Sequence, residues 1–175
     1  ARGIIQAGML EYLAESKFKY DGIFGASVGA INASLFHTGQ IQDLLDLWFT
    51  IKTSDVYSLN PLLLPFRLLS KDASLYDNTP LKKRLMNTVS VGRLRSTPIP
   101  FLIRATNTAQ VKGISIAPKD PAFMDYLVAS ASPPLAFPPV RMGANVLVDG
   151  GIYDNFGIEE AIDAAWNLMD SVAKE

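Results

Sequence analysis

The chain has 175 residues, no cysteine and a formal net charge of -1, with 16 basic and 17 acidic residues. This length fits a single domain, and a content of 49% hydrophobic and 19% charged residues lies at the apolar end of the globular range. The lack of cysteine excludes disulfides, thiolate metal ligands and a cysteine nucleophile. No basic cluster is long enough to follow a phosphate backbone, which argues against nucleic acid as a partner, and no apolar run suits a membrane span or signal peptide. We therefore expect a soluble protein, either cytoplasmic or membrane-peripheral.

The first third of the chain predicts three helices and one strand. Apolar residues near a helical period predict a helix over 4–16, and the short, mostly apolar segment 20–24 predicts a strand. A second helix is expected over 28–38, ended by Gly39, because glycine suits the left-handed backbone that follows many helices. The period continues over 41–49 and predicts a third helix.

Residues 52–79 show no regular period, because prolines and short polar residues interrupt them. We expect an irregular insertion or flap here. Within it, the apolar segment 62–69 lies between two prolines. It fits either a short core helix or a mobile, interfacial segment that meets lipid.

The second half of the chain alternates strands and helices. Thr79 as a cap and Pro80 at the first helical position predict a helix start. Strands are expected over 99–105 and 111–116, then a helix over 121–130, a hairpin of 138–141 with 145–148, and a helix over 158–169. This alternation predicts an α/β fold of three layers, α/β/α, around a largely parallel sheet. In such folds the functional site lies at the carboxyl ends of the strands.

The stretch Gly25-Ala26-Ser27-Val28-Gly29 lies between a predicted strand and a predicted helix. A serine at this bend is lifted out of the sheet, and the flanking Gly25 and Gly29 keep side chains out of a turn too tight for a Cβ. The pattern is typical of a nucleophile elbow, so Ser27 is the candidate nucleophile.

A serine nucleophile needs a base, and the sequence excludes the usual one. His37 is the only histidine, and it lies on the same predicted helix about 15 Å from Ser27, far beyond hydrogen-bonding distance. We expect His37 to be a helix-surface or packing residue. Asp149 is the alternative base, because it follows a predicted buried strand and precedes Gly150-Gly151, where the backbone can turn sharply. An Asx turn onto the glycine N–H groups is the structural alternative for Asp149.

These features resemble the patatin-like phospholipase family, which has a Ser-Asp dyad in Gly-X-Ser-X-Gly and Asp-Gly-Gly motifs. Ala1-Arg2-Gly3 is similar to the end of the family's glycine-rich stretch, whose backbone N–H groups form an oxyanion hole. The segments 77–81, 129–133 and 137–139 are also similar to family blocks, in the same order.

Two departures accompany the resemblance. The glycines and the strand that precede Arg2-Gly3 in the family are not in this sequence, so we expect a fragment or a processed chain. After the Asp-Gly-Gly motif, glycine occupies position 157, where the family often has proline.

The resemblance implies a patatin-like fold over 1–175 and a serine acyl hydrolase that cleaves lipid esters through an acyl-enzyme. Ser27 and Asp149 would be catalytic, without metal or cofactor. Arg2 and Gly3 would bind the oxyanion, although Arg2 also fits a solvated or phosphate-facing role. The partners would be a lipid or other acyl ester and a transient membrane or micelle surface; the sequence does not indicate an oligomeric state. The alternatives are a general carboxylesterase or thioesterase, or a catalytically silent interaction domain.

Overall fold

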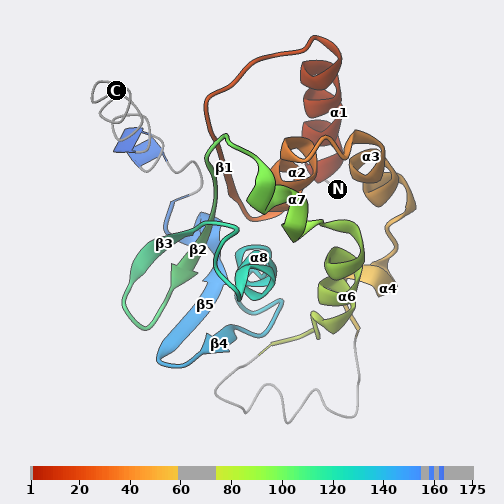
Figure 1. Ribbon diagram of the computed structural model, residues 1–175. Helices are drawn as coiled ribbons and strands as arrows, with labels where there is room; N and C mark the ends of the chain where they lie inside the picture. The colour runs from red at the N-terminus through yellow and green to blue at the C-terminus, as the bar shows by residue number, and fades with distance from the viewer. Residues whose placement is uncertain (1, 59–73, 155–157, 160–161, 164–175) are drawn as a thin grey trace.

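The computed structural model describes residues 2–58, 74–154, 158–159 and 162–163 (Figure 1). Its helices α1, α2 and α3 lie together at one end, and α8 lies in front of the sheet at the other. The helices are α1 (Arg2–Glu15), α2 (Val28–His37), α3 (Ile41–Thr50), α4 (Thr53–Val56), α6 (Thr79–Thr88), α7 (Val91–Ser96), α8 (Phe123–Ser130) and the 3-10 turn η1 (Gly150–Ile152). The strands are β1 (Ile23–Ala26), β2 (Phe101–Asn107), β3 (Lys112–Ile116), β4 (Val140–Met142) and β5 (Asn145–Asp149).

The sheet is mixed, with strand order β1-β2-β5-β4 and β3 also paired to β2. The β1–β2 pair is parallel, whereas β2–β3, β2–β5 and β4–β5 are antiparallel. The expected α/β fold is confirmed, with helices on both sides of the sheet. The expectation of a largely parallel sheet is wrong for the described strands, because two hairpin-type connections place β3 and β4 antiparallel to their neighbours.

Strands β1 and β5 share one edge of β2. Strand β3 pairs with residues 103–107 of β2. Both β1 and β5 pair with residues in or next to this range, so both must lie along the edge of β2 that β3 leaves free. On that side Ala26 at the end of β1 pairs with Arg104, and Asp149 at the end of β5 pairs with Ala105. The two strands therefore run toward one another and end at adjacent positions, which brings their carboxyl ends together.

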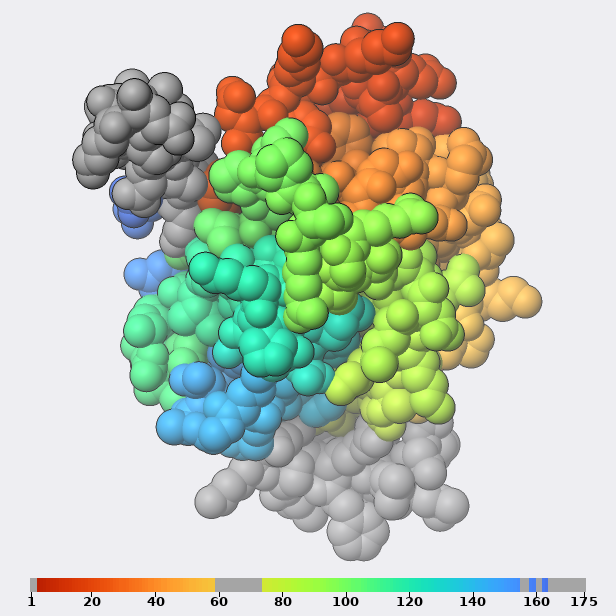
Figure 2. All heavy atoms as spheres, viewed as in Figure 1, coloured from red at the N-terminus to blue at the C-terminus, as the bar shows by residue number. Residues whose placement is uncertain are grey.

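Helices cover this junction and form the core. Helix α2 packs on β1 and β2, α8 packs on β2 and β5, and α1 packs on α2 and α3. Figure 2 shows the red and orange atoms of the first three helices directly against the green atoms of the α6 and α7 region. The largest buried side chains are apolar ones from these layers: Phe123, Leu35, Leu44, Leu47, Leu85, Ile103, Leu127 and Leu147. The junction of β1 and β5 is thus fixed by packing on several sides.

Most predicted elements are confirmed within a few residues. The helices predicted over 4–16, 28–38 and 41–49 match α1, α2 and α3, and Gly39 has φ +69, as expected after a helix end. The hairpin of 138–141 with 145–148 matches β4 and β5.

Other predictions are shifted or wrong. Strand β1 begins at Ile23, not residue 20, and the helix α7 was not predicted. Asn78, not Thr79, precedes the first turn of α6, because the Asp77 side chain accepts from the N–H and hydroxyl of Thr79 and draws it into the helix. The 62–69 segment and most of the predicted 158–169 helix lie outside the described residues.

Candidate active site

Ser27 occupies the bend between β1 and α2 in a strained backbone conformation. Its φ is 56° and its ψ is −135°, a region that non-glycine residues rarely adopt and that costs about 1–3 kcal/mol. Such a conformation persists only where the surroundings enforce it. The strand-to-helix bend and the strain match the geometry expected of a nucleophile elbow.

The two flanking glycines have different roles. A Cβ at Gly25 would lie 2.7 Å from Ala30 Cα and 2.9 Å from the Gly29 carbonyl oxygen, so α2 can pack on β1 only if residue 25 is glycine. A Cβ at Gly29 would meet only the Gln6 side chain, at an ordinary 3.6 Å. The expectation that the turn excludes a side chain holds for Gly25 and is wrong for Gly29.

The structure brings Ser27 and Asp149 together. Ser27 Oγ donates a hydrogen bond to Asp149 Oδ2 at 2.6 Å, although 122 residues separate them in the chain. The other carboxylate oxygen, Oδ1, accepts from the Gly151 N–H at 2.8 Å. The Asx-turn interpretation of Asp149 is therefore compatible with a catalytic one, because one oxygen accepts from Gly151 and the other accepts from the Ser27 hydroxyl.

Burial tunes the Asp149 carboxyl. Only 6% of the residue is exposed, and burial raises the pKa of Asp149 above its ordinary 3.8, while the hydrogen bonds from Ser27 and Gly151 act in the opposite direction. A higher pKa makes a carboxylate a stronger base. A Cβ at Gly150 would collide with the Arg104 carbonyl, so this glycine lets the chain turn against β2 just after the carboxylate.

The Ala-Ser block at 129–132 forms hydrogen bonds with both Ser27 and Asp149. Ser130 Oγ accepts from the Ser27 N–H at 3.0 Å and donates to the Arg104 carbonyl at 2.6 Å. The Ser132 carbonyl accepts from the Asp149 N–H at 3.0 Å. Both serines are fully buried. The resemblance to family blocks had pointed to this segment but not to the function of either serine.

Two polar side chains outside this block also form hydrogen bonds, one with Asp149 and one with Ser132. Thr106 Oγ1 donates to the Asp149 carbonyl at 2.8 Å and accepts from the Tyr153 N–H at 3.2 Å. Asn78 Nδ2 donates to Ser132 Oγ at 3.0 Å, which connects the 77–81 segment to the site. No sequence pattern identified Thr106.

His37 is a packing residue, as expected. It is 7% exposed and stacks on Phe101 with ring centroids 5.2 Å apart, and its ring nitrogens lie 2.8 Å from Thr97 Oγ1 and 3.3 Å from the Tyr20 hydroxyl. Burial lowers the pKa of His37, against a smaller opposing effect of a backbone hydrogen bond at Ile99. These contacts place the imidazole away from the dyad.

Arg2 and Gly3 form the start of α1, which lies beside the start of α2. The Gly3 carbonyl accepts from Asn32 Nδ2 at 3.1 Å, and Gln6 Oε1 accepts from the same amide at 2.8 Å. A Cβ at Gly3 would collide with the Trp48 ring, so glycine is needed there for packing. The amino ends of α1 and α2 therefore lie at the same end of the helix pair, the end that carries Ser27.

The comparison with known protein families identifies one family. The model of the family described as patatin-like phospholipase matches residues 1–162. The chain belongs to this family. Its members are generally lipid acyl hydrolases, and the family resemblance found in the sequence is confirmed, as is the patatin-like α/β fold. No individual curated protein matches the sequence.

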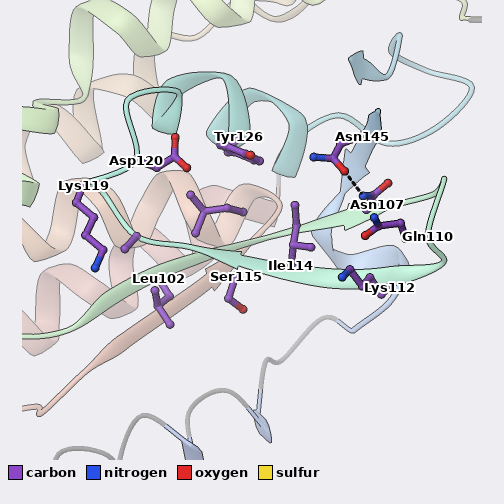
Figure 3. Close-up of a pocket in the computed structure, with 12 residues that line it drawn as sticks. Leu102, Asn107, Gln110, Lys112, Ile114, Ser115, Lys119, Asp120, Tyr126 and Asn145 are labelled. Carbon is purple, nitrogen blue, oxygen red and sulfur yellow. Dashed lines mark hydrogen bonds between the residues drawn. The ribbon is translucent and has the colours of Figure 1, made fainter. Parts of the chain in front are cut away.

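This patatin-like domain also has a pocket apart from Ser27 and Asp149. A pocket of about 760 Å³ lies around β3, with side chains from β2, β3, β5 and α8 on its walls; neither Ser27 nor Asp149 lines it (Figure 3). An Asn107–Asn145 hydrogen bond of 2.8 Å closes one side of it. Within the described ranges, no group of three or more acidic or histidine side chains could hold a metal ion. No described helix has the length and apolar character to cross a membrane.

Proposed function

We propose that this patatin-like domain is a serine acyl hydrolase that cleaves lipid carboxylic esters, of phospholipase A or lysophospholipase type, with Ser27 and Asp149 as a catalytic dyad. The observation that carries the proposal is the 2.6 Å hydrogen bond from Ser27 Oγ to Asp149 Oδ2. It supports proton transfer, because a base must lie within hydrogen-bonding distance of the proton it accepts.

In the first step Ser27 Oγ forms a bond to the ester carbonyl carbon, and its proton passes to Asp149 Oδ2. The carbonyl electron pair moves onto oxygen and gives a tetrahedral oxyanion. When this intermediate collapses, the bond to the alcohol oxygen breaks and Asp149 returns the proton to the leaving alcohol. In the second step water attacks the acyl-Ser27 ester, again with Asp149 as base, and releases the carboxylic acid and free Ser27.

The oxyanion would be stabilised by backbone N–H groups at the amino ends of two helices. The first N–H groups of a helix have no partner within it, and the helix dipole is positive there. Val28 and Gly29 begin α2, and Gly3 lies in the first turn of α1 beside it. Arg2 would add positive potential. Loss of one such donor typically lowers the rate by about 10²–10³.

Covalent labelling tests the nucleophile. A fluorophosphonate probe should modify the wild-type protein at Ser27 and should not modify Ser27→Ala, with peptide mass spectrometry to locate the adduct. The His37→Gln variant serves as the control, because it should label like the wild type. A folded protein that never reacts at Ser27 would refute the hydrolase and leave the interaction-domain alternative.

The base and the substrate class need separate measurements. Asp149→Asn should lower turnover of a soluble ester by about 10²–10⁴, the usual contribution of a positioned base; unchanged turnover would eliminate Asp149 from this role. Activity on one phospholipid below and above its micelle threshold addresses the lipid interface. A rise above the threshold supports the phospholipase, whereas no rise favours the general carboxylesterase or thioesterase.

A further inference from the structure

Arg104 is a buried arginine in the middle of β2, close to the junction of β1 and β5. Only 6% of the residue is exposed. Its main chain pairs with Ala26 at the end of β1, and its carbonyl accepts from the Ser130 hydroxyl. An arginine side chain stays charged in proteins, and burial of a charge is costly unless the surroundings compensate for it. A buried guanidinium this close to Ser27 and Asp149 is therefore a candidate for a functional role.

The Arg104 side chain points to the face of the sheet opposite α8. The rings of Phe101 in β2 and Phe123 in α8 lie 6.2 Å apart, so Phe101 faces that helix. Neighbouring residues of a strand alternate between the two faces of a sheet. Residues 103 and 105 therefore also face α8, and Arg104 shares the other face with Thr106.

On this face the guanidinium lies against Gly113 of the neighbouring strand β3. A Cβ at Gly113 would be 2.3 Å from Arg104 Nη2 and 2.7 Å from both Nε and Cζ. The φ of Gly113 is not in the left-handed region, so its backbone conformation does not require glycine. Glycine weakens a strand and often marks a place where another group comes close. Here that group is the guanidinium.

The ring of Tyr153 also contacts the guanidinium. Arg104 Cζ lies 5.5 Å from the centre of this ring, within the range of a cation–π interaction. Tyr153 directly follows the 3-10 turn η1, and its N–H donates to Thr106 Oγ1 at 3.2 Å. Strand β2 thus holds Tyr153 at two points, at the backbone through Thr106 and at the ring through Arg104.

The turn that ends at Tyr153 is the one that orients Asp149. The Asp149 carbonyl accepts from Thr106 Oγ1 at 2.8 Å, and its Oδ1 accepts from the Gly151 N–H at 2.8 Å. Gly151 therefore lies between two attachments to β2, one at each end of the turn. Movement of the Tyr153 end would displace the Gly151 N–H, and with it the carboxylate that accepts from the Ser27 hydroxyl.

We propose that Arg104 and Tyr153 are positioning residues for Asp149. The guanidinium fixes Tyr153, and Tyr153 fixes the turn that orients the carboxylate. The inference rests on the proposed function of Ser27 and Asp149. Because both residues act through the turn and not on the substrate, their loss should lower kcat and leave the KM of a short soluble ester unchanged. A displacement of about 1 Å in an active site can lower the rate about 10²-fold.

Two substitutions of Tyr153 test the ring contact. Leucine keeps apolar bulk but has no aromatic face, whereas phenylalanine keeps that face. Tyr153→Leu should lower kcat on 4-nitrophenyl acetate, and the rate of fluorophosphonate labelling per folded molecule, by about 10- to 100-fold with KM unchanged. Tyr153→Phe should retain both rates. Tyr12→Leu is the matched control, because Tyr12 on α1 is 69% exposed and Tyr153 is 55% exposed; it should equal the wild type.

Gly113→Ala tests the guanidinium from the other strand. The new Cβ would push the end of the Arg104 side chain away, while alanine itself suits a strand better than glycine. We expect kcat to fall, whereas Gly92→Ala, with open space around residue 92, should retain it. If both changes act through the guanidinium, the double variant Gly113→Ala/Tyr153→Leu should lose no more activity than the worse single variant. Losses that multiply would show independent effects and contradict the inference.

The outcomes separate the two proposals. If the wild type cleaves no ester and does not react with fluorophosphonate at Ser27, the proposed function fails and this inference with it. If the wild type is active and a folded Tyr153→Leu keeps its kcat, or Tyr153→Phe loses as much activity as Tyr153→Leu, the positioning role is wrong while the dyad stands. Arg104→Lys keeps the charge without the planar guanidinium, so it should behave like Tyr153→Leu. Should this buried variant fail to fold, the more exposed position 153 decides the matter.

Discussion

The hydroxyl of Ser130 should be needed to hold the candidate nucleophile Ser27 in place, and Ser130→Ala tests this. The side chain is fully buried and joins the Ser27 N–H to the Arg104 carbonyl, at 3.0 Å and 2.6 Å. Alanine removes both bonds and leaves the partly buried Ser27 N–H without this acceptor. An unsatisfied buried group of this kind costs about 1–3 kcal/mol. The strained backbone at Ser27 would then lose one of the contacts that enforce it.

The free energy of unfolding of Ser130→Ala should therefore fall by about 1–3 kcal/mol. Activity per folded molecule should fall as well, because a displacement of about 1 Å in an active site can lower the rate about 10²-fold. Urea unfolding followed by tryptophan fluorescence gives the first quantity. Turnover of a short soluble ester and the rate of fluorophosphonate labelling give the second.

Ser34→Ala is the matched control. Ser34 is also fully buried, but its hydroxyl donates at 2.7 Å to the Ala30 carbonyl within its own helix. Alanine is the better helix former, so the loss of this local bond should be largely offset, with a change within about 0.5 kcal/mol and normal activity. Equal activity in the Ser130→Ala and Ser34→Ala variants would refute the positioning role of Ser130.

Three further predictions follow from the site. Gly25→Ala should lower stability by about 1–3 kcal/mol and activity about 10²-fold, because the new Cβ would lie 2.7 Å from Ala30 Cα; Gly92→Ala, with open space around it, is the control, and normal activity of Gly25→Ala would contradict the close packing at the elbow. Burial raises the pKa of Asp149, so this group stabilises the fold at acid pH and loses that contribution as the pH rises through its folded pKa. Thermal melts should accordingly show Asp149→Asn more stable relative to wild type at neutral pH than at about pH 3, and a difference independent of pH would exclude the raised pKa. His37→Gln should retain turnover per folded molecule, and a loss of two orders of magnitude would reopen a histidine mechanism.

Several features of the site follow from local sequence. The change from strand to helix around Gly25–Gly29 can be predicted from neighbouring residues, because the hydrophobic period and the helix-ending glycine act over a few positions. The exclusion of His37 is local as well, since both it and Ser27 lie along one helix of known rise. Asp149 could be recognised from a short buried strand followed by two glycines.

What the sequence could not determine is how these local features meet. The prediction placed Ser27 and Asp149 at one edge of a parallel sheet, whereas β1 and β5 approach end to end along β2, because the direction of each strand depends on connections and pairing partners far away in the chain.

Dependence on distant segments also explains why the two elbow glycines differ and why the contacts of the Ala-Ser block could not be predicted. Gly25 and Gly29 are equivalent in the motif, but their surroundings come from Ala30 in one case and from Gln6 of α1 in the other. Ser130 acts on a residue 103 positions away. The sequence by itself therefore indicated the candidate nucleophile, the candidate base and the class of fold. Only tertiary packing decided which side chains hold Ser27 and Asp149, because this depends on contacts between segments that are distant in the chain.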